Sequence, residues 1–122
     1  MKKIYIAGKI SGEVGTPELM SKCVKKFNDY GYSLLEGGTF KDGLQFIQEK
    51  SGGKAFIHGF IINHSLIASG NGTWEQYMRN DIKALMECNE IHLLPDWRDS
   101  VGAKLEHQIA DALGMKIVYV LG

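Results

Sequence analysis

Short apolar runs that end at a turn residue predict β-strands at three places in the chain. They are KIYIA at residues 3–7, EIHLLP at residues 90–95 and KIVYVLG at residues 116–122. Runs of this length, rich in β-branched residues and bounded by glycine or proline, are typical of strands in a sheet. A fourth run, YSLLE at residues 32–36, is interpreted as the second strand along the chain.

Apolar residues at helical spacing predict three helices between these strands. The first is expected over residues 17–30, the second after a capping box of Thr73 and Gln76, and the third from Ser100 to Gly114. The residues expected to face inward are Leu19, Cys23, Val24, Phe27 and Tyr30 in the first helix, Trp74, Tyr77, Met78, Leu85 and Cys88 in the second, and Leu105, Ile109, Ala112 and Leu113 in the third.

Alternation of strands and helices favours an α/β fold in which a parallel sheet carries helices on both faces. The simplest candidate is a doubly wound sheet in the order 2-1-3-4, within a single domain over residues 1–122. Residues 37–73 contain 8 of the 15 glycines and interrupt the pattern with an irregular insertion. An extra strand, a short helix, a flap over a site and a flexible surface insertion all remain open for this segment.

Composition narrows the classes of partner. The 14 basic and 14 acidic side chains balance, which argues against nucleic acid polymers as partners, because their binding requires an excess of positive charge. No apolar run is long enough for a signal peptide or a membrane span. The two cysteines, Cys23 and Cys88, are interpreted as reduced core thiols, so we expect a cytoplasmic protein.

In an open parallel sheet, ligands bind beyond the carboxyl ends of the strands, where the strand order reverses. The loops after the first and third strands of the predicted sheet meet there. They contain small, hydroxyl, charged and aromatic residues suited to an anionic sugar or nucleotide, although ordinary connecting loops have similar compositions. The candidate binding residues are Gly8, Lys9, Ser11 and Gly12 in the first loop, and Asp96 and Trp97 in the second.

The start of the third predicted helix offers a second part of the site. Ser100 is expected to cap this helix, whose free N–H groups also favour an anion. Gly102 and Glu106 share one helical face, so the missing side chain at position 102 leaves space above the carboxylate. A capping serine and a solvated glutamate are the alternative interpretations.

Asp81 lies on the inward face of the second predicted helix, among positions that are otherwise apolar. A buried aspartate is costly unless it is paired or used, and Arg79 and Lys83 are its candidate ion-pair partners. Tyr5, in the middle of the first strand, is either a core residue or a hydrogen-bond partner for a carboxylate.

Metal binding has no support in the sequence. The four histidines, His58, His64, His92 and His107, show no ligand spacing, and the cysteines are far apart. We therefore expect neither a metal site nor a cofactor. His107 is interpreted instead as forming a surface pair with Asp111, one helical turn away.

Three segments together resemble a known family: IYIAG at residues 4–8, NDI at residues 80–82 and SVGAKLE at residues 100–106. In this order and spacing they are similar to the signatures of the nucleoside 2-deoxyribosyltransferase family. The runs WEQYMRNDIKAL, LLPDW and SVGAKLEHQIA look closest to its uncharacterised bacterial and phage branch. The resemblance covers about two-thirds of the chain and leaves residues 37–73 unmatched.

The resemblance implies a flavodoxin-like fold, a homodimer and a set of roles. Glu106 matches the nucleophilic glutamate, Tyr5 the tyrosine that orients it, and Asp81 the aspartate that handles a proton. Ser100 matches a serine that binds the 5′-phosphate in nucleotide-cleaving members. Where those members carry a phosphate-binding arginine, this chain has Ser11, with Lys9 nearby as the cation.

We therefore expect an N-glycosidic bond enzyme, a hydrolase or a deoxyribosyl transferase, that acts on a nucleoside or its 5′-monophosphate through a covalent glycosyl-glutamate. A nucleotide-binding or signalling module with little or no turnover is the alternative. A third possibility is an interaction protein that assembles through apolar residues of the middle segment, namely Phe56, Ile57, Phe60 and Ile61.

Overall fold

The computed structural model describes residues 2–9, 25–30, 38–41, 45–48, 54–63, 66, 70 and 72–121. The strands are β1 (Lys3–Ala7), β2 (Gly38–Lys41), β3 (Gln45–Gln48), β4 (Lys54–Ile57), β5 (Glu90–Leu93) and β6 (Lys116–Tyr119). The helices are α2 (Gly59–Ile62), α4 (Trp74–Met86), α5 (Val101–Ala112) and the 3₁₀ helix η2 (Trp97–Asp99). Residues 25–29 are helical as well.

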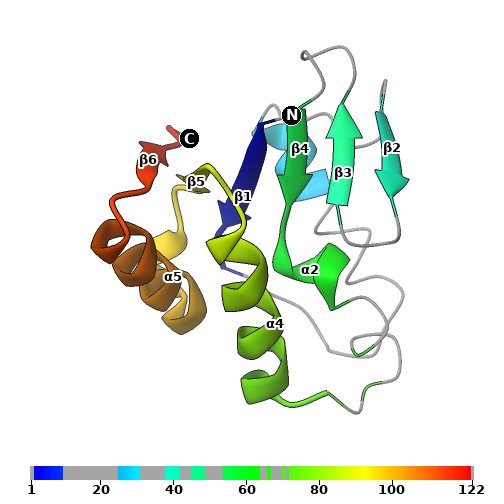
Figure 1. Ribbon diagram of the computed structural model, residues 1–122. Helices are drawn as coiled ribbons and strands as arrows, with labels where there is room; N and C mark the ends of the chain where they lie inside the picture. Colours follow the sequence, from blue (N-terminus) through cyan, green and yellow to red (C-terminus); the bar gives the residue numbers. More distant parts are fainter. Residues whose placement is uncertain are drawn as a thin grey trace.

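The strands form one sheet in the order β2-β3-β4-β1-β5-β6 (Figure 1). Neighbouring strands from β4 to β6 are parallel. Numbered along the chain, these four strands, β1, β4, β5 and β6, have the order 2-1-3-4. The predicted α/β fold, a flavodoxin-like doubly wound sheet, is confirmed.

The strand beside β1 comes from an unexpected part of the sequence. The place that the sequence analysis gave to residues 32–36 is occupied by β4, within residues 37–73, and residues 32–36 themselves lie outside the described residues. β2 and β3 extend the sheet beyond β4 through antiparallel pairing. The segment 37–73 is therefore not irregular throughout, because it supplies three strands and the short helix α2.

Strand register assigns the core side chains to two faces. Paired residues of parallel strands point to the same face, so Tyr5 shares its face with Ile57 and Ile91. This face packs under α4 and α5, and the cluster there also includes Leu85, Ala103 and Ala110. On the other face His58 contacts Phe27, with 4.4 Å between ring centroids. In Figure 1 the helical residues 25–29 accordingly lie behind the sheet and α4 and α5 in front.

Helix starts agree with the sequence analysis. Thr73 and Gln76 form both hydrogen bonds of the capping box of α4. The Ser100 hydroxyl accepts a hydrogen bond from the Ala103 N–H at 3.1 Å and caps α5. After α5, Gly114 has φ of 68°, the left-handed conformation that favours glycine and ends a helix.

The buried face of each long helix differs in part from the prediction. On α4 the buried residues are Met78, Asp81 and Leu85, whereas Trp74 at the helix start is 53% exposed. On α5 the small residues Ala103 and Ala110 lie with Glu106 against the sheet. The larger apolar residues at 105 and 109 are only partly buried, and Leu113, expected to face inward, is 58% exposed.

The described part of the chain contains no helix that is long and apolar enough to cross a membrane. Cys88 is a buried free thiol. Cys23 lies outside the described residues.

Candidate active site

Tyr5 is the centre of the candidate site. It lies in the middle of β1, is 1% exposed and points toward α4 and α5. Its side chain is hydrogen-bonded to that of Glu106. Burial, followed by the negative charges of Glu106 and Asp81, raises the pKa of Tyr5 well above its usual value. The hydroxyl therefore keeps its proton and donates a hydrogen bond to the carboxyl group of Glu106.

Glu106 lies on the buried face of α5 and is 5% exposed. Burial raises its pKa to about 8, the Asp81 charge acts in the same direction, and the hydrogen bond from Tyr5 lowers it. One carboxyl oxygen, Oε2, is buried and has no hydrogen-bond partner among the described residues. A buried carboxyl oxygen without a partner is unusual, and it marks this side chain as a functional candidate.

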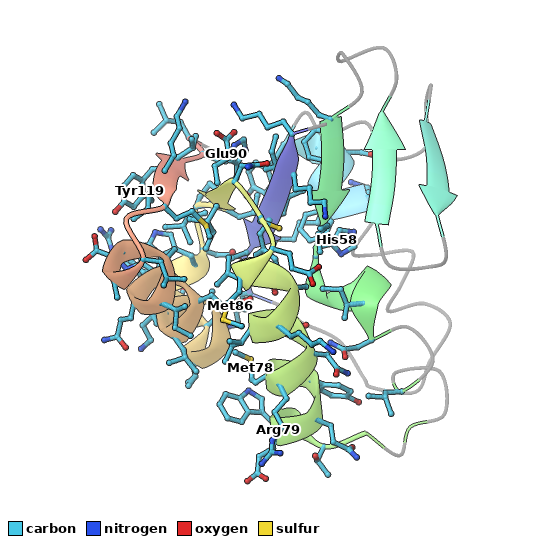
Figure 2. All side chains as sticks on the ribbon, in the orientation of Figure 1. His58, Met78, Arg79, Met86, Glu90 and Tyr119 are labelled. Atoms are coloured by element: carbon cyan, nitrogen blue, oxygen red, sulfur yellow. The ribbon has the colours of Figure 1, made fainter. Side chains whose placement is uncertain are left out.

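Asp81 lies on the buried face of α4 and is 6% exposed. Burial raises its pKa to about 7, while a hydrogen bond from Asn63 lowers it. Among the described residues, the ion pair with Arg79 or Lys83 is not formed. Arg79 is exposed and points away from the fold in Figure 2. The sequence predicted the burial of Asp81 correctly. The side chain that bonds to it is the amide of Asn63 and not one of the two expected cations.

The two carboxyl groups interact, since the charge of Asp81 raises the pKa of Glu106. Two such acids lose their protons in two steps that belong to the pair. With pKa values of about 7 and about 8, the pair holds one proton between these pH values. One acid and one carboxylate close together can serve as proton donor and nucleophile.

Asn63 is a site residue that the sequence analysis missed. Its Nδ2 donates to Asp81 Oδ1 at 2.8 Å, and its own Oδ1 accepts from Asn80 Nδ2 at 2.9 Å. Asn63 directly follows α2 and is 3% exposed. The signal available in the sequence was a polar residue immediately after the apolar run that ends at Ile62.

The loops after β1 and β5 meet, as predicted. The Lys9 N–H donates to Asp96 Oδ1 at 3.0 Å. At Gly8 a Cβ atom would lie 2.8 Å from Leu94 Cδ1, so the close approach of the loops requires glycine. Ser11 and Gly12 lie outside the described residues.

Lys26 is a second residue that the sequence analysis missed. Its ammonium group donates to the Lys9 carbonyl oxygen at 2.6 Å and forms an ion pair with Asp96. The side chain of Lys26 is 24% exposed and that of Asp96 is 31% exposed, so the ion pair is partly buried. A cation from the first helical segment thus reaches the loops where an anionic ligand was expected.

The space predicted above Gly102 is occupied. A Cβ atom at this position would lie 2.9 Å from Met78 Sδ, so the glycine lets α5 approach α4. Figure 2 shows Met78 between the two helices. Gly102 therefore serves helix packing, and the expectation of open space there is wrong.

Trp97 packs in an aromatic cluster beside α5. Its ring centroid is 4.6 Å from that of His107 and 6.2 Å from that of Tyr119, and the Arg98 guanidinium lies 5.0 Å from its centre. His107 Nε2 is 3.1 Å from the Tyr119 hydroxyl oxygen, so its partners are these rings and not the expected Asp111. Stacking of Trp97 on a ligand stays a prediction.

No group of three or more histidine, cysteine, aspartate or glutamate side chains suited to a metal ion occurs among the described residues. The site consists of two buried carboxyl groups, a phenol and an amide. These groups support acid, base and nucleophilic chemistry.

A family model described as a domain of unknown function (DUF4406) matches residues 44–119, more than half of the chain. The match includes β4, α4, β5, α5 and thus both carboxyl groups of the site. No curated protein and no solved structure matches the chain.

Proposed function

The chain belongs to the DUF4406 family, and from this premise we propose that it cleaves or transfers N-glycosidic bonds of nucleosides or nucleoside 5′-monophosphates. The observation that carries the proposal is the arrangement of Tyr5, Asp81 and Glu106. These residues come from three distant segments, are almost fully buried, and interact through a hydrogen bond and through charge. They are also the residues that resemble the catalytic set of the nucleoside 2-deoxyribosyltransferases.

Glu106 is the proposed nucleophile. Its carboxylate attacks the anomeric carbon of the sugar, the bond to the base breaks, and a glycosyl ester forms. Water or a second base then displaces the glutamate. Each step inverts the anomeric carbon, so the net result is retention. The hydrogen bond from Tyr5 supports this role, because it stabilises the ionised carboxyl group and directs one oxygen.

Asp81 is the proposed proton donor. The departing base takes up the electron pair of the broken bond, and a proton from Asp81 neutralises it. General acids of this kind typically contribute about 10²- to 10⁴-fold in rate. A pKa of about 7 suits this task, since the group is then partly protonated near neutral pH.

The reactive form of the pair carries its single proton on Asp81 and has Glu106 ionised. It is the minor of the two singly protonated forms, because the pKa of Glu106, about 8, lies above that of Asp81, about 7. A second form with the same net charge carries the proton on Glu106. The ratio of the two forms depends on local hydrogen bonds and not on pH. The rate is therefore expected to follow the singly protonated pair and to fall on both sides of about pH 7–8.

A phosphate group of the substrate is proposed to bind near the loops after β1 and β5. Lys9 and Lys26 lie at these loops, and the chain after β5 continues through η2 to the N-terminus of α5 at Ser100. Backbone N–H groups at a helix N-terminus favour anions. The reaction would take place in the cytoplasm, where nucleotides occur, and in a homodimer, as in the family that the chain resembles.

A second candidate is a nucleotide-binding or signalling module without turnover. The absence of an arginine at Ser11, where the nucleotide-cleaving members of the family that the chain resembles carry one, favours this candidate. Release of free base separates these two candidates. Thermal unfolding with the same nucleosides and 5′-monophosphates separates a nucleotide-binding module from an interaction protein that binds neither. A ligand at 100 times its dissociation constant stabilises a protein by about 2.7 kcal/mol.

The test of the proposed function is the release of free base. The protein is incubated with a mixture of nucleosides and 5′-monophosphates, and the products are separated by chromatography. We expect base release by the wild type and a loss of about 10³-fold or more in Glu106→Gln, which removes the nucleophile at nearly constant volume. Near-wild-type release by a folded Glu106→Gln protein would contradict the proposal.

A further inference from the structure

The side chain of Asp81 is held on one side by an amide pair that the family resemblance does not include. Asn63 Nδ2 donates to Asp81 Oδ1 at 2.8 Å, and Asn80 Nδ2 donates to Asn63 Oδ1 at 2.9 Å. Asn80 and Asp81 are neighbours on α4, whereas Asn63 follows α2. The Asn63 N–H bonds to the Gly59 carbonyl oxygen at 2.9 Å, which fixes the residue at the end of α2.

The orientation of the Asn63 amide follows from its neighbours. Its NH₂ end faces Asp81 Oδ1 and also the Tyr77 carbonyl oxygen, at 3.5 Å. A carbonyl oxygen accepts but never donates, so it favours NH₂ at this end whatever the state of Asp81. The other end accepts from Asn80. Asn63 consequently cannot turn round to accept a hydrogen bond from Oδ1 unless it gives up the contact with the Tyr77 carbonyl oxygen and the Asn80 amide turns as well.

The second carboxyl oxygen of Asp81, Oδ2, faces Gly59 of α2. A Cβ atom at Gly59 would lie 3.0 Å from Asp81 Oδ2 and 3.3 Å from Oδ1, so the absence of a side chain at position 59 lets α2 approach the carboxyl group. Because Oδ1 already accepts a hydrogen bond from Asn63, a proton on that oxygen would oppose the N–H group. The proton of a neutral Asp81 is therefore favoured on Oδ2.

We propose that Asn63 is a positioning residue for Asp81: its amide holds Oδ1, and the carboxyl proton is carried and released by Oδ2. The assignment of Oδ2 as the releasing oxygen depends on the proposed function, whereas the contact that fixes it does not. The amide also stabilises the ionised form of Asp81, so it limits how strongly burial retains the proton.

Titratable groups face Asp81 from two other elements. They are Tyr5 on β1 and Glu106 on α5. The Cys88 thiol after α4 lies near Tyr5, and burial raises its pKa to about 12, so it stays neutral over the range of the titration. From α2, the described contacts are those of Gly59 and Asn63, neither of which titrates. Removal of the Asn63 donor therefore changes the Asp81 environment without changing the charge of a neighbour.

The test measures the titration of Asp81 directly, by ¹³C NMR of a protein labelled at the aspartate carboxyl carbons, with Asp81→Asn to assign its signal. In Asn63→Leu, a change of similar volume, we expect the Asp81 midpoint to rise by about one pH unit. Asn80→Ala, at an exposed position, frees the Asn63 oxygen and is expected to give a smaller rise. If Asn63→Leu does not fold, the midpoint measured in Asn80→Ala tests the proposal in its place.

Asn89→Leu is the matched control. Asn89, just before β5, accepts a hydrogen bond through Oδ1 from the Lys3 N–H at 2.8 Å, and among the described residues it has no hydrogen bond to Asp81. We expect its variant to leave the midpoint unchanged. Unchanged midpoints in both Asn63→Leu and Asn80→Ala would overturn the proposal. If the protein releases base, the optimum of its pH–rate profile should rise in Asn63→Leu. A shifted midpoint in a protein that releases no base would reject the proposed function and retain the Asn63 contact.

Discussion

The hydroxyl group of Tyr5 is hydrogen-bonded to the carboxyl group of Glu106, and both side chains are almost fully buried. The bond joins the central strand β1 to α5 across the face of the sheet that also receives Asp81 from α4. It leaves Oε2 of Glu106 without a partner among the described residues. The phenol orients one oxygen, and the other is available for chemistry.

Tyr5→Phe is expected to raise the pKa of Glu106, because the hydrogen bond from the phenol lowers it in the wild type. The shift should be about one pH unit, and the upper limb of the pH–rate profile should move upward with it. A ¹³C titration of labelled glutamate measures the first effect without substrate. An unchanged Glu106 midpoint would show that the hydrogen bond does not stabilise the carboxylate.

Asp81→Asn is expected to slow base release by about 10²- to 10⁴-fold while the protein stays at least as stable as the wild type at neutral pH. The amide removes a buried acid, and its oxygen can still accept from Asn63. Substrates whose leaving group needs no proton should lose much less rate. Clear destabilisation in urea with an unchanged rate would assign Asp81 a structural role instead.

The free energy of unfolding is expected to fall by about 1 kcal/mol or more between pH 7 and pH 9. The folded-state pKa values of Asp81 and Glu106, about 7 and about 8, are raised above their ordinary values of 3.8 and 4.5. Above the ordinary pKa values, the folded protein therefore binds more protons than the unfolded chain. The free energy of unfolding falls as pH rises, until Asp81 and Glu106 are ionised in the folded protein as well.

The double variant Asp81→Asn/Glu106→Gln is the control for this effect, and it should show a flatter dependence over the same range. His58, whose pKa burial lowers to about 3 from 6.5, acts in the opposite direction. Its contribution ends near pH 6.5, below the range of the measurement. Parallel curves for wild type and double variant in urea titrations would exclude the acid pair as the cause.

Gly8→Ala is expected to destabilise the protein by about 1–3 kcal/mol, because the added methyl group meets Leu94 in a packed core. Leu94 is fully buried, and the two closest contacts would be 2.8 and 2.9 Å. Gly114→Ala is a useful comparison, since strain at its positive φ is the sole cost and nothing lies within 4 Å. A Gly8→Ala protein as stable as the wild type would mean that the two loops can separate without cost.

Local signals predicted the elements that build most of the fold. β1 spans residues 3–7 as expected, and the starts of α4 and α5 follow from the caps at Thr73 and Ser100. These features depend on neighbouring residues alone. β4 was not predicted because the apolar run of residues 55–62 serves two structures: a strand as far as Ile57 and then, after His58, the helix α2.

The site was predictable where a residue contradicted its surroundings. Asp81 and Glu106 are acids on buried helix faces, and Tyr5 is a polar ring in a central strand. Asn63 and Lys26 show no such contrast, because amides and lysines are ordinary in turns and helices. Their importance arises from tertiary contacts with Asp81 and Asp96, which sequence spacing does not reveal.

The most direct test of the proposed chemistry is the mass of the peptide that contains Glu106. The protein is mixed with a nucleoside 5′-monophosphate that it cleaves, quenched in acid within milliseconds to seconds, digested and measured. We predict a mass increase equal to the glycosyl phosphate, located on Glu106 and absent from Glu106→Gln. An adduct on another residue, or an adduct that persists in Glu106→Gln, would contradict the assignment of the nucleophile.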